Sequence, residues 1–145
     1  MASTFKNAGL DVGVLDDSTG DIYTATGSGV TAVIHAVYIS NLSATNDAKV
    51  NVKVTIDGGS TFRHVGRSLN VPANNTLVLD KPINLENNDK IRIYADPNPD
   101  SSSVDVEAYV SILEISECLY KYLKLIEQDK KILMVLEEQR KACYI

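Results

Sequence analysis

The pattern of hydrophobic and polar positions changes its period once along the chain. Residues 48–115 carry strand signals almost without interruption, and within residues 50–56 apolar and polar residues alternate strictly. That alternation is the period of a half-buried strand. The segment from Glu117 to Cys143 contains no Gly or Pro and has apolar residues at helical spacing. The sequence therefore predicts a β domain over residues 1–115 and an amphipathic helix over residues 116–145.

About eight short segments have strand character and are separated by turn residues. After a weakly patterned start, the strands are expected at 21–26, 30–42, 49–56, 61–71, 76–79, 90–95 and 104–115. Asp57-Gly58-Gly59 supplies the positive φ angles of a tight hairpin, and Gly66 is a candidate bulge. No helical segment separates the strands, which disfavours a parallel α/β sheet. The predicted fold is mainly β, an antiparallel β-sandwich or jelly roll.

The longest apolar run, Val30 to Leu42, is apolar on both faces, as in a central or covered strand. Strict alternation divides it into two faces, with Ala32, Ile34, Ala36 and Tyr38 on one and Val33, His35, Val37 and Ile39 on the other. His35 is therefore expected to be a hydrogen-bonded core residue. His64 lies beside Arg63 and Arg67 and is expected on a polar face.

The predicted helix begins near Ser116, a suitable N-cap, with Glu117 in the first turn, where the helix dipole favours a carboxylate. Strand edges and the apolar stripe of this helix are the predicted assembly contacts. The stripe comprises Leu119, Tyr122, Leu125, Ile126, Ile132, Leu133 and Leu136. The stripe could dock on its own sandwich or on another subunit. We favour the second arrangement, because a helix of ~40 Å exceeds what one small sandwich can cover.

Composition narrows the choice of partners. The chain has 145 residues, which suggests one domain, and residues 1–115 hold 8 Lys plus Arg against 14 Asp plus Glu, a net charge of −6. An acidic domain is a poor nucleic-acid binder.

The sequence contains no apolar run of membrane-spanning length and no secretory h-region, so synthesis in a cytoplasm is expected. Cys118 and Cys143 are expected to be reduced and buried, with an intersubunit disulfide as the alternative.

Candidate chemistry is sparse. His35 and His64 lack Cys, Asp or Glu at metal-ligand spacing, which argues against zinc. The segment from Asp96 to Asp100, with Ser102 and Glu107, has the oxygen spacing of a calcium loop, but Ser101 occupies the position where such a loop needs Gly. No nucleophile elbow or phosphate-binding loop is visible. We predict no catalytic residue, no metal ligand, no cofactor and no enzymatic activity.

Carbohydrate binding is the alternative function. Sugar platforms favour stacked aromatic rings, above all Trp. The chain has no Trp, and four tyrosines could line a sheet: Tyr23, Tyr38, Tyr94 and Tyr109.

Several segments together carry a resemblance to a known group of proteins. They are TAVIHAVYISNL (31–42), AKVNVKVTI (48–56), VPANNTLVLDKPINL (71–85), NDKIRI (88–93) and SILEI (111–115). Over residues 5–115 the chain resembles small β-sandwich virion structural proteins of tailed, marine, myovirus-like bacteriophages. The resemblance implies a subunit of the virion, such as a capsid decoration (cement) protein or a head-tail accessory protein, that assembles with itself and with other virion proteins. A receptor- or carbohydrate-binding module of a phage tail is the alternative. The segment from Ser116 onward departs from this pattern.

Overall fold

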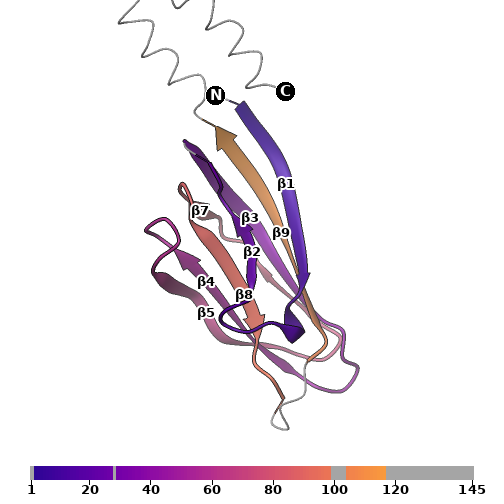
Figure 1. The fold of residues 1–145 in the computed structure, drawn as a ribbon. Coiled ribbons are helices and arrows are strands. Elements are labelled where there is room, and N and C mark those ends of the chain that lie inside the picture. Colours follow the sequence, from indigo (N-terminus) through magenta and orange to yellow (C-terminus); the bar gives the residue numbers. More distant parts are fainter. Residues whose placement is uncertain (1, 28, 99–103, 117–145) are drawn as a thin grey trace, which may run out of the picture.

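The computed structural model describes residues 2–27, 29–98 and 104–116, which form two antiparallel sheets packed face to face (Figure 1). The elements are β1 (Ala2–Asp11), a 3-10 turn η1 (Val12–Val14), β2 (Asp21–Thr24), β3 (Val30–Asn41), β4 (Ala48–Thr55), β5 (Phe62–Val71), β6 (Thr76–Leu79), β7 (Ile83–Leu85), β8 (Lys90–Ala95) and β9 (Val106–Ser116). The predicted terminal helix lies outside the described residues, and with it the seven residues of the expected assembly interface and both cysteines.

The chain crosses repeatedly between the two sheets. The first, called sheet A, has the strand order β1-β9-β3-β6, and β7 also pairs with β3. The second, called sheet B, has the order β2-β8-β4-β5. Every pairing is antiparallel. The prediction of a mainly β, antiparallel sandwich is confirmed.

Valine and isoleucine side chains from the facing sides of both sheets form the core. The largest fully buried ones, joined by one leucine, are Ile34, Ile39, Leu85, Ile91, Ile93, Ile112, Val12, Val37, Val50, Val52, Val71 and Val106. The alternation predicted for β4 places Val50, Val52 and Val54 inside, as expected, but Ile56 is 61% exposed because β4 ends at Thr55. Burying such β-branched side chains on one face of each strand is what stabilises a sandwich of this size.

One β-bulge in β3 reverses which side chains point inward. Ile34 pairs with Ile112, and Ala36, two residues later, pairs with Ser111, which is adjacent to Ile112 in β9. The extra residue, His35, shifts the alternation by one position. Val37 and Ile39 are therefore buried, and Tyr38 is 40% exposed on the outer side. The prediction that Tyr38 shares a face with Ile34 is wrong for this reason.

The predicted core position of His35 is also wrong. The bulge turns His35 out of the core, and its side chain is exposed. Its ring stacks on the ring of Phe5, with centroids 6.4 Å apart. His64 is exposed on β5, as expected for a polar face.

Two strands were not predicted. Strand β1 is exposed along most of its length, so its sequence lacks the alternation that reveals a half-buried strand. Strand β7 has three residues and follows Pro82 directly. Both are recognisable only from their partners, β9 for β1 and β3 for β7.

Strand β5 is irregular at the free edge of sheet B. Its pairing with β4 shifts twice, between Val50 and Val52 and between Val52 and Lys53. Ser68 has a φ of 50° and donates its backbone N–H to the Asn51 side chain at 3.0 Å. Gly66, the candidate bulge, itself pairs with Val52, and the two shifts lie on either side of it. Such bulges interrupt the straight backbone ladder that an edge strand offers to another chain.

Within residues 2–27, 29–98 and 104–116, we find no helix of the length and apolar character needed to cross a membrane.

Gly13 should be essential for stability. A Cβ atom there would overlap the backbone carbonyl oxygen of Val104, whereas a Cβ at Gly9 would reach only an ordinary contact, 3.4 Å from the Ala108 oxygen. We expect Gly13→Ala to lower the free energy of unfolding by about 2–4 kcal/mol, as overpacking does. Gly9→Ala, the matched control, should change it by less than about 0.5 kcal/mol. Urea unfolding followed by circular dichroism measures both, and equal effects would contradict the steric argument.

Candidate functional site

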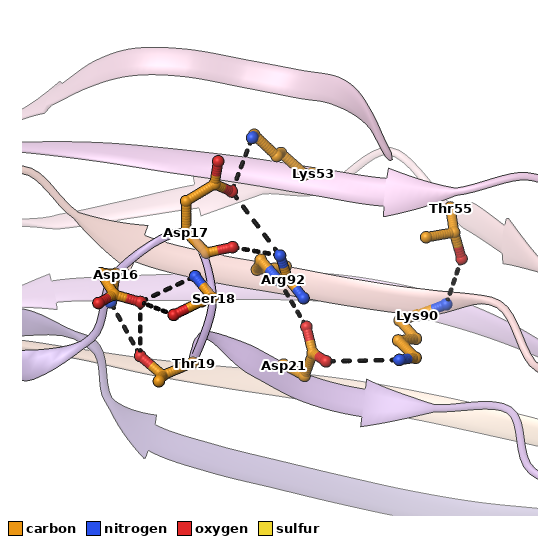
Figure 2. Close-up of polar contacts among 9 residues, drawn as sticks. All are labelled: Asp16, Asp17, Ser18, Thr19, Asp21, Lys53, Thr55, Lys90 and Arg92. Carbon is orange, nitrogen blue, oxygen red and sulfur yellow. Dashed lines mark hydrogen bonds and ion pairs between the residues drawn. The ribbon is translucent and has the colours of Figure 1, made fainter. Parts of the chain in front are cut away.

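A cluster of charged side chains covers the outer face of sheet B. Lys53 on β4 donates to Asp17 at 2.7 Å, and Arg92 on β8 donates through Nε to Asp21 at 2.6 Å. Arg92 also lies 3.8 Å from the Asp17 carboxylate and donates to the Asp17 backbone oxygen. Lys90 completes the cluster at 3.7 Å from Asp21. Figure 2 shows Asp17 between Lys53 and Arg92, and Asp21 between Arg92 and Lys90.

The turn that supplies Asp17 is fixed by its own side chains. The Asp16 carboxylate accepts from the Ser18 backbone N–H at 2.8 Å, from the Ser18 hydroxyl at 2.6 Å and from the Thr19 hydroxyl at 3.1 Å (Figure 2). These bonds lower the pKa of Asp16, with the Ser18 side chain as the largest cause. The turn is thus held in shape independently of Arg92 and Lys53.

Arg92 and Lys53, the two cations that contact Asp17, each also lie over an aromatic ring. The guanidinium of Arg92 lies 4.0 Å from the centroid of the Phe62 ring, and the Lys53 ammonium lies 5.6 Å from that of Tyr94. Cation–π contacts of this kind add to the ion pairs. The cluster therefore ties β2, β8, β4 and β5 together, and each of its five charged side chains has an ion-pair partner of opposite sign.

The resolved pKa shifts of the described groups single out no candidate general acid or base. A general acid or base works best with a pKa near neutrality. The hydrogen bond to Asp17 raises the pKa of Lys53, and hydrogen bonds from Thr61 lower that of Asp57. Every pKa shift resolved among the described residues likewise moves away from neutral pH.

The other candidate site lies on the outer face of sheet A, where two rows of side chains cross the strands. Gly9, Tyr109, Tyr38 and Val78 pair in one row across β1, β9, β3 and β6, and Asp11, Glu107, Ser40 and Thr76 form the next. The rings of Tyr38 and Tyr109 have centroids 6.0 Å apart and are tilted by 52°. A hollow of about 380 Å³ opens over these rows, lined by Gly9, Leu10, Asp11, Tyr38, Ser40, Glu107, Ala108 and Tyr109.

The hollow combines aromatic rings with two carboxylates. Tyr38 and Tyr109 are 40% and 44% exposed, and the Asp11 and Glu107 side chains are exposed beside them. Asp11 accepts the backbone N–H of Gly13 at 3.1 Å. Among the described residues, the Glu107 side chain has no hydrogen-bond or ion-pair partner. Gly9, the β1 residue opposite Tyr109, lines the hollow without a side chain of its own.

The same face continues as a second apolar row. Phe5, Leu113 and Val33 pair across β1, β9 and β3, and Phe5 is 79% exposed. We call the set Phe5, Tyr38, Val78 and Tyr109 the tyrosine face. The sequence signal that could have found it, the outward alternation along β3, was hidden by the bulge at His35.

The four tyrosines proposed for a sugar platform do not lie together. Tyr38 and Tyr109 are neighbours on sheet A, whereas Tyr94 lies on sheet B beneath Lys53. The Tyr23 hydroxyl donates to Glu114. A platform containing both Tyr94 and Tyr109 is therefore not formed.

The first and last residues of the candidate calcium loop, Asp96 and Glu107, have different surroundings. The Asp96 carboxylate accepts from the Asn51 side chain at 2.9 Å, and Glu107 faces outward in the hollow. Residues 99–103 lie outside the described residues. Within the described ranges, no three His, Cys, Asp or Glu side chains converge in a way that could hold a metal ion.

A third polar group joins the two sheets near the end of β9. Glu114 accepts from the Tyr23 hydroxyl at 2.6 Å and from the Lys6 ammonium at 3.0 Å. Desolvation raises the pKa of Glu114, but the hydrogen bonds from Tyr23 and Lys6 outweigh it, so that pKa is lowered overall. The pKa of Tyr23 is raised by burial and by the adjacent Glu114.

Comparisons with known proteins identify no close relative. No protein-family model matches the chain, and no curated protein matches it. Among solved structures it is similar to the globular domain of the zebrafish complement 1qA protein, with 14% identity, 68% of this chain and 71% of that chain covered, and a TM-score of 0.38. A TM-score this low marks a distant similarity, from which we infer nothing about function.

Glu114 should make stability depend on pH. Because its folded-state pKa lies below the ordinary value of 4.5, its contribution is full above that value and is lost as pH falls through the folded pKa. We expect Glu114→Gln to cost about 1 kcal/mol at pH 7. The difference from wild type should vanish in strong acid. Urea unfolding from neutral to strongly acidic pH tests this, with the exposed Glu86→Gln as control, and a difference that persists unchanged at the acid end would contradict it.

Proposed function

We propose that this protein is a non-enzymatic structural subunit that assembles in multiple copies, with the outer face of sheet A as the contact surface. The observation that carries the proposal is the tyrosine face. It exposes Phe5, Tyr38, Val78 and Tyr109 on one side of one sheet, in paired rows.

Exposed apolar residues are common on monomers when they are scattered. Here four of them share one sheet face, with the half-buried Val33 and Leu113 beside them. A face of this kind favours burial against a partner, and aromatic residues dominate the energetics of such contacts. The charge cluster on sheet B has the opposite character, because its charged side chains are already ion-paired with one another.

The setting we infer is the virion of a tailed bacteriophage, as a decoration or head-tail accessory subunit made in the host cytoplasm. The resemblance over residues 5–115 supports it, and a compact sandwich suits repetition on a shell or tube. In this proposal the stripe from Leu119 to Leu136 forms a helix that adds a second contact. Many modest contacts then act together through avidity.

A carbohydrate-binding module is the second candidate, and the hollow is the observation that favours it. Tyr38 and Tyr109 present adjacent rings, with the Ser40 hydroxyl and the Glu107 carboxylate as hydrogen-bonding groups. Binding to a glycan array that is lost on Tyr109→Ser, by a chain that stays monomeric, would favour this second function.

Removing the two tyrosines should weaken assembly. We expect wild type to be oligomeric in light scattering with mass determination, and Tyr38→Ser/Tyr109→Ser to shift the mass toward the monomer. Each lost aromatic contact should cost about 1–2 kcal/mol of association free energy. Ile56→Ser/Val14→Ser is the matched control, because both residues are exposed and neither lies on a strand of sheet A. An unchanged mass in the tyrosine variant, or an equal loss in the control, would reject the tyrosine face.

The contribution of residues 117–145 to self-association can be measured apart from that of the tyrosine face. Because β9 ends at Ser116, a chain shortened after this residue retains all nine strands. We expect it to keep its stability and to self-associate more weakly than the full chain. If the shortened and full chains have the same association state at every concentration, residues 117–145 make no contact between copies.

A further inference from the structure

We propose that the hollow beside Tyr38 and Tyr109 receives arginine side chains from the β5 edge of a second copy, so that copies join head to tail. The β5 edge is defined as Arg63, His64 and Arg67. This inference rests on the proposed function and names the surface that the tyrosine face meets.

The hollow has the chemistry of a guanidinium site. A guanidinium stacks on aromatic rings and binds a carboxylate through its planar fork of N–H donors. Tyr38 and Tyr109 supply the rings, and Glu107 and Asp11 supply carboxylates in the adjacent row. The Glu107 side chain has no partner among the described residues, so its charge is available to an incoming cation.

The β5 edge has the complementary chemistry. Arg63, His64 and Arg67 are all exposed on one edge strand of an otherwise acidic domain. Of the three arginines among the described residues, Arg92 is held by Asp17, Asp21 and Phe62. Arg63 and Arg67 have no ion-pair partner within the described ranges. Both arginines lie on β5 in sheet B, whereas the unpaired carboxylate of the hollow lies on sheet A.

The shape of β5 favours contact through side chains. A regular edge strand would invite pairing of its backbone with another strand. The two register shifts and the positive φ of Ser68 break that ladder where Arg67 and Val65 lie. A partner that meets β5 meets protruding side chains. Val65, 45% exposed between the two arginines, adds an apolar group that matches Tyr38 and Tyr109.

Topology keeps the two surfaces apart on one molecule. The hollow lies on the outer face of sheet A, over β1, β9 and β3, whereas β5 is the free edge of sheet B. Figure 1 shows β1 and β5 on opposite sides of the sandwich. One copy cannot satisfy its own hollow, so the contact must form between copies and is heterologous.

Charge reversal on either surface tests the pairing. We expect Arg63→Glu/Arg67→Glu and, separately, Glu107→Arg to weaken self-association by about tenfold each. The control for the first is Lys49→Glu/Lys81→Glu, which makes the same charge change at two exposed lysines. The control for the second is Glu86→Arg. Both controls should associate as wild type does.

Mixing the two reversed chains is the sharper experiment. In an equimolar mixture, the acidic β5 edge of one variant can face the basic hollow of the other, and the two unaltered surfaces can pair as in wild type. We expect the mixture, measured by sedimentation equilibrium, to recover the association lost by each variant alone. Failure to recover would show that these groups do not face each other and would overturn the inference.

The inference and the proposed function fail differently. If Tyr38→Ser/Tyr109→Ser dissociates the protein while Arg63→Glu/Arg67→Glu associates normally, the tyrosine face stands and the β5 edge is not its partner. If the full chain is monomeric at every concentration, both are wrong.

Discussion

The bulge at His35 is the constraint on which the surface of this molecule depends. Side chains alternate along a strand, so one extra residue moves every later side chain to the other face. After the bulge, Val37 and Ile39 complete the core, and Tyr38 turns outward beside Tyr109. Without the extra residue, Tyr38 would compete for core volume and two β-branched residues would face solvent. The core and the proposed contact surface are therefore set by the same local irregularity.

The two outer faces of the sandwich differ in how far their polar and aromatic groups are already paired within the molecule. On sheet B, Asp17 and Asp21 neutralise cations that also stack on Phe62 and Tyr94, so little interaction capacity remains. On sheet A, aromatic rings and Glu107 stay exposed. Charged side chains that are ion-paired within the molecule contribute modestly to its stability, and they have few unpaired groups left to bind a partner. Unpaired charged groups beside an apolar surface can bind a partner more strongly.

The sequence predicted the half-buried strands well, because their alternation records burial directly. Strands β6 and β8 have the expected bounds, and β2, β3, β4, β5 and β9 lie within one or two residues of them. Strand β1 was missed because an exposed edge strand needs no alternation, and β7 because three residues are too few to show a period. Of the candidate site, Tyr38 and Tyr109 were named individually. Their adjacency depends on the register of β3 against β9, which no local pattern reveals.

The pairing of β1 with β9 has a practical consequence. Ala2 lies opposite Ser116, so the beginning of the first strand and the end of the last are neighbours at one rim of the sandwich (Figure 1). A purification tag or fluorescent label attached ahead of Ala2 would begin beside the end of β9. Fusions intended to leave that rim unobstructed are better inserted at the far rim, for example in the 43–47 loop between β3 and β4.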